Sequence, residues 1–298
     1  VVGVCAPASH IGGFNGTSMD VWTHGGTLVA LGFPGSFDAR GVIDAIERYG
    51  ITMMFAVPAI VRAILDEHER GDGDLSSWVR PLVGGDAMTA DLAEAMRAVG
   101  LSPIHVWGMT ETSGAGTVAT PDSSAPAGSL GVPFPYVDLR VMASDEREAD
   151  VDEMGEIWVR GPGVVSGEEW LRTGDLATRD AGGWLHMVGR AHHMINTAGE
   201  LVAPPTVERA LRTLDEVSDA LVVGLPDERW GQIVAALIVP SVQGRAQASS
   251  MCAEALSAAL SDALAPWEKV RRVLVVDALP TTTTGKPDPV AAARLFDA

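Results

Sequence analysis

The stretch PLVGGDAMTADLAEAMRAVGLSPIHVW (residues 81–107) contains the structural unit from which the first part of the chain is built. Two short apolar runs, residues 81–83 and 104–107, flank residues 90–99, where apolar side chains recur at helical spacing. The helical pattern ends at Gly100, and glycine commonly follows the last helical turn because it adopts the left-handed conformation at little cost. This stretch therefore predicts a strand, a helix and a second strand.

The same alternation extends toward the N-terminus. A helical pattern over residues 39–49 follows Asp38, a favourable N-cap residue, and stops at Gly50. Buried strands are predicted at residues 1–5, 27–31 and 51–56. Strands that alternate with helices predict a parallel sheet covered by helices.

The pattern changes after about residue 121. Residues 121–131 are rich in Pro, Ser, Ala and Gly and predict a linker or long loop. No long helix separates the next strands, so we expect a small antiparallel β unit. Its strands are predicted at residues 137–141, 155–159 and 184–188, the last after a turn at residues 180–183.

The remaining residues predict a separate α+β domain. Helices are expected at residues 205–214 and 250–264, and strands at 220–223, 233–239 and 273–276. The fold class expected is thus α/β: a parallel sheet with flanking helices, a small antiparallel β unit, and a separate α+β C-terminal domain. We place a large domain at residues 1–189, divided into an α/β subdomain (1–120) and a β-rich subdomain (121–189), and a mobile C-terminal domain at residues 190–298.

Composition and charge exclude several classes of function. The chain has 298 residues with a formal charge of −18, so a nucleic acid partner is not expected. Its longest apolar stretch, residues 51–65, is about 15 residues long and is interrupted by Pro58 and Arg62. A membrane-spanning helix needs about 20 apolar residues, so no transmembrane segment is expected.

The cysteines and the first residue suggest where the protein acts. Cys5 and Cys252 lie far apart and form neither a disulfide framework nor a metal-binding pair, which favours the reducing cytoplasm. The chain begins at Val1 inside an apolar run, without a signal-peptide pattern. We interpret it as a chain whose natural N-terminus lies further upstream.

Lysine is rare in this chain. Only Lys269 and Lys286 are lysines, whereas arginine supplies all other basic side chains. The segment LPTTTTGKP (residues 279–287) predicts an exposed loop with one ammonium group, suited to a phosphate or a carboxylate. It is not a Walker A loop, because Pro280 and Pro287 replace the glycine and the hydroxyl residue required. A flexible surface lysine is the alternative interpretation.

A second segment, VWGMTETSGAG (residues 106–116), follows a predicted strand. It should therefore lie at the carboxyl edge of the parallel sheet, where α/β proteins bind ligands. Trp107 offers a ring for stacking on a base, Thr110 a hydroxyl for a phosphate, and Glu111 an oxygen ligand for Mg²⁺. A β-to-α turn without a ligand is the alternative.

Two further segments are weaker signals. In LRTGDL (residues 171–176), Asp175 in a tight turn could accept hydrogen bonds from ribose hydroxyls. In GRAHHMINTAGE (residues 189–200), the adjacent histidines lack metal-ligand spacing. A simple turn and a solvated linker are the respective alternatives.

Taken together and in this order, the segments resemble the adenylate-forming superfamily, specifically the AMP-forming acyl-CoA synthetases. The resemblance extends over essentially the whole chain. It rests on seven segments: His10-Ile-Gly-Gly13, Gly84-Gly-Asp-Ala-Met88, Trp107-Gly-Met-Thr-Glu111, Thr173-Gly-Asp175, Gly189-Arg190 with Gly199-Glu200, Asp227-Glu-Arg-Trp-Gly231, and Thr284-Gly-Lys286.

The resemblance implies a two-step reaction with ATP, Mg²⁺ and coenzyme A. A small carboxylic acid attacks the α-phosphate of ATP to give an acyl-adenylate and pyrophosphate, and the thiol of coenzyme A then displaces AMP. Negative charge accumulates in both steps, so cations and hydrogen-bond donors are needed where it develops.

The resemblance also implies roles for individual residues. Catalysis would involve Lys286 between carboxylate and α-phosphate, Thr110 on the AMP phosphate, Glu111 on Mg²⁺, and His10 as the gate of the acyl pocket. The nucleotide would also contact Gly85, Asp86, Ala87, Trp107, Gly108, Asp175 and Arg190. The acyl pocket would be lined by His10, Gly84, Met109 and Ser113, coenzyme A would contact Gly199 and Trp230, and His192 would be the hinge.

Two departures from the family pattern qualify this prediction. The hinge position usually carries Lys or Asp, but here it is His192. The family's phosphate-binding loop should precede His10 by some tens of residues, and the chain begins at Val1. We therefore expect a C-terminal portion of such an enzyme that is a poor catalyst alone.

Alternative functions remain open at this point. The chain could be a non-catalytic remnant that binds a nucleotide or an acyl group, or an adenylation domain that acylates a carrier protein. A serine hydrolase is excluded because the sequence has no Gly-x-Ser-x-Gly motif. The small and apolar candidate pocket residues suit a fatty, alicyclic or aryl acid without selecting among them.

Overall fold

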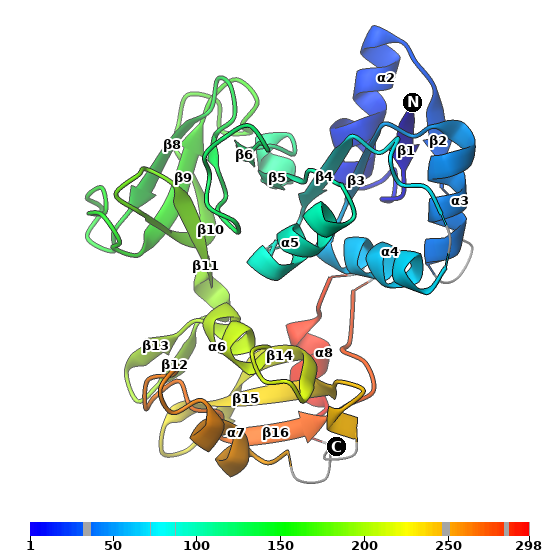
Figure 1. The fold of residues 1–298 in the computed structure, drawn as a ribbon. Helices are drawn as coiled ribbons and strands as arrows, with labels where there is room; N and C mark the ends of the chain where they lie inside the picture. The colour runs from blue at the N-terminus through cyan, green and yellow to red at the C-terminus, as the bar shows by residue number, and fades with distance from the viewer. Residues whose placement is uncertain (32–36, 72, 87, 246–250, 283–285, 298) are drawn as a thin grey trace. The chain divides into compact units, whose positions relative to one another are not determined.

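The structure is a computed structural model that describes residues 1–31, 37–71, 73–86, 88–245, 251–282 and 286–297. It contains two compact units (Figure 1). The first unit comprises Val1–Thr173 and Ala177–Met187, and the second comprises Gly174–Leu176 and Val188–Ala298. Each unit is described by itself below.

The first unit is built on a seven-stranded sheet with the strand order β2-β1-β3-β4-β5-β6-β7. The pairs from β2 to β5 are parallel, and β6 and β7 extend the sheet in antiparallel pairing. The predicted parallel sheet is thereby confirmed. The strands are β1 (Val2–Val4), β2 (Leu28–Ala30), β3 (Met53–Ala56), β4 (Arg80–Gly84), β5 (Ile104–Trp107), β6 (Thr117–Ala119) and β7 (Val132–Pro133).

Three helices form the main apolar core together with this sheet. They are α3 (Ala39–Tyr49), α4 (Pro58–Arg70) and α5 (Ala90–Ala98). The Asp38 carboxylate accepts a hydrogen bond from the Gly41 N–H at 3.0 Å, and Gly50 has a left-handed φ of 60°, so both predicted ends of α3 are found. Ile46 and Ile64 are completely buried, and burial of such a side chain contributes about 1.5–3 kcal/mol.

Helix α4 was not expected. The apolar run of residues 51–65 contains both strand β3 and most of α4, so its continuous hydrophobicity hid the boundary between them. The boundary lies at Pro58, which is the first helical residue and needs no hydrogen-bonded N–H there.

A second unexpected helical segment follows β1. It consists of α1 (Ile11–Gly13), the π-helical turn η1 (Phe14–Ser18) and α2 (Met19–His24). The hydroxyls of Thr17 and Ser18 are buried and donate hydrogen bonds to the Gly13 carbonyl at 2.9 and 2.7 Å. Because these polar side chains face inward, the segment lacks the apolar periodicity of an amphipathic helix.

An antiparallel sheet follows, as predicted, with the order β11-β10-β9-β8. One face packs on an apolar cluster that includes Val141, Ile157 and Val159. The β10–β11 turn is held by Asp180, which accepts N–H bonds from Gly182 and Trp184 at 2.9 Å. The strands are β8 (Asp138–Met142), β9 (Gly155–Arg160), β10 (Leu171–Arg179) and β11 (Leu185–Arg190).

The rest of the second unit is an α+β domain around a five-stranded sheet, which agrees with the predicted fold class. Its order is β13-β12-β15-β14, and β16 pairs with β15 in parallel. The sheet has an apolar cluster on each face, one including Val222 and Leu256 and the other Leu221 and Phe296. The strands are β12 (Ile195–Thr197), β13 (Glu200–Val202), β14 (Val217–Asp227), β15 (Gly231–Pro240) and β16 (Arg272–Val275).

The helices of this domain differ in extent from the prediction. They are α6 (Pro204–Leu211), α7 (Ala253–Ala259) and α8 (Pro289–Arg294), with the 3₁₀ turn η3 (Ala191–His193) before β12. Helix α7 is shorter than the expected 250–264, whose first residue lies outside the described residues, and α8 was not expected. Among the helices of the described residues, none is both long and apolar enough to cross a bilayer.

His105 on β5 should make stability depend on pH. Its side chain is buried, and its Nδ1 lies 2.7 Å from the Ser129 carbonyl oxygen. Burial disfavours the charged imidazolium and lowers the pKa of His105. The unfolded chain, with a histidine pKa of about 6.5, then binds more protons than the native chain, so native stability falls as the pH drops below that value.

We expect urea unfolding to show this loss between pH 7.5 and pH 5.5, and to show a smaller loss in a His105→Gln variant. His24→Gln is the control, because His24 is highly exposed. An equal loss of stability in the wild type and in His105→Gln would contradict the assignment.

Candidate functional site

The carboxyl ends of β1, β3, β4 and β5 lie at one edge of the sheet because these strands are parallel neighbours. Three predicted segments follow these strands: residues 10–13 after β1, 84–88 after β4, and 107–116 after β5. The edge is the usual ligand-binding edge of an open α/β sheet. The first unit therefore brings these three segments together.

The loop after β5 is tightly folded back on itself. Thr110–Thr112 form a 3₁₀ turn, and Ser113 has a left-handed φ of 53°. The Gly114 N–H donates to the Met109 carbonyl at 2.9 Å, and the Gly116 N–H donates to the Trp107 carbonyl at 2.8 Å. These bonds fix the backbone from which Thr110 and Glu111 extend, and both residues are exposed.

Glycine is required at the ends of β4 and β5. A Cβ on Gly84 would lie 2.3 Å from the Val106 carbonyl oxygen, and one on Gly108 would lie 2.4 Å from the Gly114 carbonyl oxygen. Each of these two distances is far shorter than a van der Waals contact, and the oxygen approached belongs to the backbone. The close approach therefore depends on the absence of side chains at Gly84 and Gly108.

The ring of Phe55 on β3 connects two of these segments, which the sequence analysis did not predict. A Cβ on Gly12 would lie 2.6 Å from Phe55 Cε1, and one on Gly84 would lie 3.2 Å from Phe55 Cε2. The ring thus packs between the two glycines. Phe55 belongs to the candidate site as a packing residue, although a single aromatic residue in a strand carries no sequence signal for that position.

Side chains tie the segment after β1 to the loop after β5. The Asn15 amide donates to the Ser113 carbonyl at 2.6 Å, and the Ser113 hydroxyl donates to the Gly163 carbonyl at 2.7 Å. The half-buried His10 accepts a hydrogen bond from the Gly12 N–H at its Nδ1, at 3.2 Å. That bond leaves Nε2 as the ring nitrogen that would act as a donor.

A turn from β9 also supports the loop. The Val165 N–H donates to the Glu111 carbonyl at 2.8 Å, although Val165 is 74% exposed.

Within the described parts of the chain, no group of three His, Cys, Asp or Glu side chains could hold a metal ion. The lone carboxylate of Glu111 suits Mg²⁺ that arrives with a nucleotide, because Mg²⁺ is often bound by one or two carboxylates plus phosphates.

Other predicted residues of the first unit are placed as follows. Asp86 is exposed, Gly85 has a φ of 81°, and Met109 is half-buried. Ala87 lies outside the described residues. Trp107 is 7% exposed and packs in the apolar cluster of the antiparallel unit, so other side chains of the protein already cover most of the indole surface. Its stacking on adenine stays a prediction.

Asp175 differs from the sequence-based expectation in its backbone. It lies within strand β10 rather than in a tight turn, although the preceding Gly174 has a φ of 72°. Its carboxylate is 1% exposed and its Oδ1 lies 2.9 Å from Arg190 Nε at the end of β11. β10 and β11 are neighbours in the sheet, so the two residues form an ion pair between adjacent strands.

Two residues predicted to contact coenzyme A are brought together in the second unit. The Ala198 N–H donates to the Trp230 carbonyl at 2.8 Å, next to Gly199, whose φ is 90°. The guanidinium carbons of Arg229 and Arg271 each lie 4.8 Å from the centre of the Trp230 ring. The result is an indole flanked by positive charge.

The predicted hinge lies in the exposed 3₁₀ turn η3. The rings of His192 and His193 have their centres 4.2 Å apart. Partial burial lowers the pKa of His193, and the positive charges of His192 and Arg190 lower it further. His193 therefore loses its proton more readily than an exposed histidine.

Lys286 is half-buried and lies at the base of its loop rather than at an exposed tip. An antiparallel bridge pairs Thr281 with Pro287, and the Thr282 N–H donates to the Lys286 carbonyl at 2.7 Å. Residues 283–285 lie outside the described residues. Asp288 then caps α8 through the N–H groups of Val290 and Ala291.

Comparison with known proteins identifies the family. Residues 1–167 match the family described as AMP-binding enzyme, and residues 206–286 match the AMP-binding enzyme C-terminal domain. The chain belongs to the AMP-binding enzyme family. The predicted resemblance to adenylate-forming enzymes is thereby confirmed.

Individual relatives of this AMP-binding enzyme cover nearly all of the chain. A feruloyl-CoA synthase from Amycolatopsis is 32% identical over 95% of this chain and 59% of its own length. An indoleacetate–CoA ligase from Aromatoleum aromaticum is 31% identical over 94% of this chain and 56% of its own length. The chain thus spans somewhat more than half the length of these relatives.

Among solved structures, o-succinylbenzoate coenzyme A synthetase from Bacillus subtilis in complex with ATP and magnesium ion is 27% identical, with a TM-score of 0.79. That match covers 96% of this chain and 60% of the synthetase. This similarity in fold agrees with the family assignment and with the parallel sheet of the first unit.

The glycine contact at the sheet edge can be tested by substitution. We expect Gly84→Ala to destabilise the protein by about 1–3 kcal/mol, because the methyl group must displace the Val106 carbonyl. Gly163→Ala is the control, because a Cβ at Gly163 meets nothing within 4 Å. Equal urea midpoints for the two variants would show that the contact at Gly84 is not tight.

Proposed function

We propose that this protein activates an apolar carboxylic acid with ATP to form an acyl-adenylate and then transfers the acyl group to coenzyme A. The observation that carries the proposal is the sheet edge where β4 ends at Gly84 and β5 leads into the loop of Thr110 and Glu111, in a chain of the AMP-binding family. The names of its relatives, which are CoA synthases and ligases, support the acceptor. We place the reaction in the cytoplasm, where both cosubstrates are available.

In the first step, a carboxylate oxygen of the acid bonds to the α-phosphorus of ATP, and the bond to pyrophosphate breaks with its electron pair on pyrophosphate. Lys286 offsets the charge shared by the carboxylate and the α-phosphate, and the Thr110 hydroxyl donates to a phosphate oxygen. Glu111 would hold Mg²⁺, which when bound would neutralise charge on the phosphates.

In the second step, the thiol of coenzyme A gives up its proton to water, its sulfur bonds to the acyl carbon, and AMP leaves with the electron pair of the broken C–O bond. Asp175 accepts hydrogen bonds from the ribose hydroxyls while Arg190, 2.9 Å away, orients it. Gly199 and Trp230 line the path of coenzyme A, and His192 is the hinge between the two steps. His10, Gly84, Met109 and Ser113 border the acid.

The activity can be tested with the natural full-length protein. We expect AMP release that needs ATP, coenzyme A and an acid, with rates that differ by at least tenfold across aryl, alicyclic and fatty acids. The measurement is AMP formed per enzyme with each acid in turn. A phosphopantetheinylated carrier protein replaces coenzyme A in a parallel assay. No AMP release with any acid and either acceptor would favour a non-catalytic remnant.

Lys286 provides the sharper test. We expect Lys286→Ala to slow acid-dependent exchange of pyrophosphate into ATP by 100-fold or more, because the charge it neutralises develops in the transition state. Lys269→Ala, which removes the other lysine, should retain wild-type exchange. A wild-type exchange rate in Lys286→Ala would refute the assigned role.

A further inference from the structure

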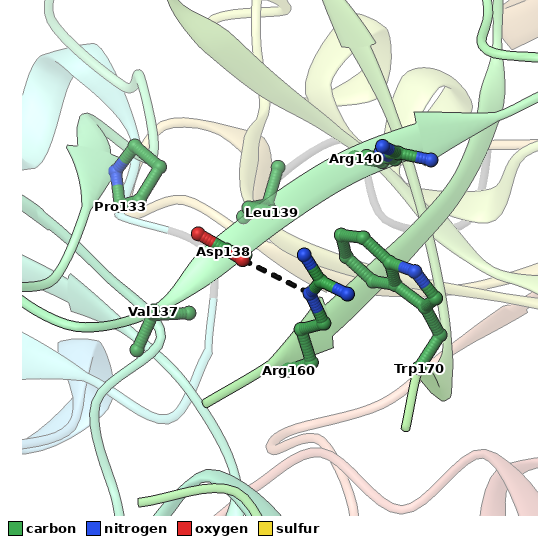
Figure 2. A pocket seen from close by; sticks show the side chains of 7 residues that line it. All are labelled: Pro133, Val137, Asp138, Leu139, Arg140, Arg160 and Trp170. Atoms are coloured by element: carbon green, nitrogen blue, oxygen red, sulfur yellow. Dashed lines mark hydrogen bonds and ion pairs between the residues drawn. The ribbon is translucent and has the colours of Figure 1, made fainter. Parts of the chain in front are cut away.

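The indole of Trp170 lies beside two arginines on the antiparallel sheet of the first unit. The guanidinium carbons of Arg140 and Arg160 lie 4.8 and 4.7 Å from the centre of its ring. Arg140 belongs to β8, Arg160 ends β9, and Trp170 precedes β10 (Figure 2). Three neighbouring strands thus contribute to one cluster of positive charge around an aromatic ring.

The two arginines differ in how their charges are balanced. Arg160 Nε donates to Asp138 Oδ2 at 2.9 Å, and the register pairs these residues directly across β8 and β9. Arg140 has no carboxylate partner within the described residues, and its guanidinium lies over the Trp170 ring. A cation held over an indole keeps its N–H donors in the guanidinium plane available to a ligand.

These residues border a pocket of about 370 Å³. Pro133, Val137 and Leu139 supply its apolar residues, and Asp138 also lines it; Figure 2 shows Pro133 and Val137 on the side away from Trp170. The volume is at the small end of ligand pockets and well above that of a simple inorganic anion. The pocket therefore combines a charged end with an apolar wall.

The wall is fixed by a strained turn. Tyr136 has a left-handed φ of 67°, which is unusual for a bulky residue, and the Val137 N–H donates to the Phe134 carbonyl at 3.0 Å. Gly161 packs so closely that a Cβ there would lie 2.2 Å from the Tyr136 carbonyl oxygen. Strained backbone that neighbouring structure enforces is concentrated at functional sites.

We propose that this pocket binds an organic anion composed of one anionic head and a small apolar body. Arg140 binds the head with paired N–H donors, and Pro133, Val137 and Leu139 pack on the body. The long-range field of a chain with a charge of −18 opposes an anion, so binding depends on short-range contacts at this cluster. None of the pocket residues belongs to the candidate site at the sheet edge.

Binding can be followed on Trp170 itself. The probe is benzenesulfonate, which carries an anionic head on a ring and has no carboxylate to be adenylated. We expect a saturable shift of the Trp170 indole N–H resonance, which a Trp170→Phe variant identifies among the eight tryptophans. Arg140→Gln should weaken binding by tenfold or more, and Arg140→Lys should bind with intermediate affinity because it keeps the charge but loses the paired donors.

The controls separate the parts of the site. Arg48→Gln removes an arginine whose guanidinium carbon lies 5.3 Å from the centre of the exposed Tyr49 ring. This variant should bind benzenesulfonate with wild-type affinity. Inorganic phosphate, which lacks the apolar body, and benzyl alcohol, which lacks the charge, should both bind at least tenfold more weakly. The proposal is overturned by the absence of a saturable shift, by unchanged affinity in Arg140→Gln, or by phosphate binding as tightly as benzenesulfonate.

Discussion

The contact of bare backbone at the ends of β4 and β5 is the constraint on which the candidate site depends. Because Gly84 has no side chain, its α-carbon approaches the carbonyl of Val106, its partner on β5. The ring of Phe55 lies 3.2 Å from the position that a Cβ of Gly84 would take. A methyl group at Gly84 would therefore require the ends of β4 and β5 to move apart.

The loop after β5 is held by hydrogen bonds from segments remote in sequence. Asn15 bonds to it from η1, and Val165 bonds to it from the turn after β9. These contacts use the backbone carbonyls of Ser113 and Glu111, and the Glu111 side chain stays at the surface. The fold thus fixes the positions of the loop atoms while exposing the carboxylate.

Periodic features were predictable from the sequence. Strands β3, β4 and β5 and helices α3 and α5 follow from apolar spacing and end signals, since each depends on neighbours along the chain. Helix α4 was missed because one apolar run covers a strand and a helix, although Pro58 marks the start. The segment of Thr17 and Ser18 was missed because buried hydroxyls there bond to their own backbone.

The candidate site was predictable only as a set of segments. Motifs located the residues around Gly84, Thr110 and Asp175, but contacts between remote segments, such as Phe55 against Gly84, leave no periodic trace in the sequence. Asp175 was expected in a turn because Thr-Gly-Asp is a turn signal, whereas the strand there tolerates Gly174 at a positive φ.

The bridge between Thr281 and Pro287 restricts the backbone that carries the ammonium group of Lys286. A side chain on an open loop would lose much conformational entropy on meeting an anion, and part of the interaction energy would be cancelled. Here the backbone of Lys286 is already restricted by that bridge and by its bond to Thr282. Ordering of this backbone has thus taken place during folding, which would reduce the entropy lost in the anion binding proposed for Lys286.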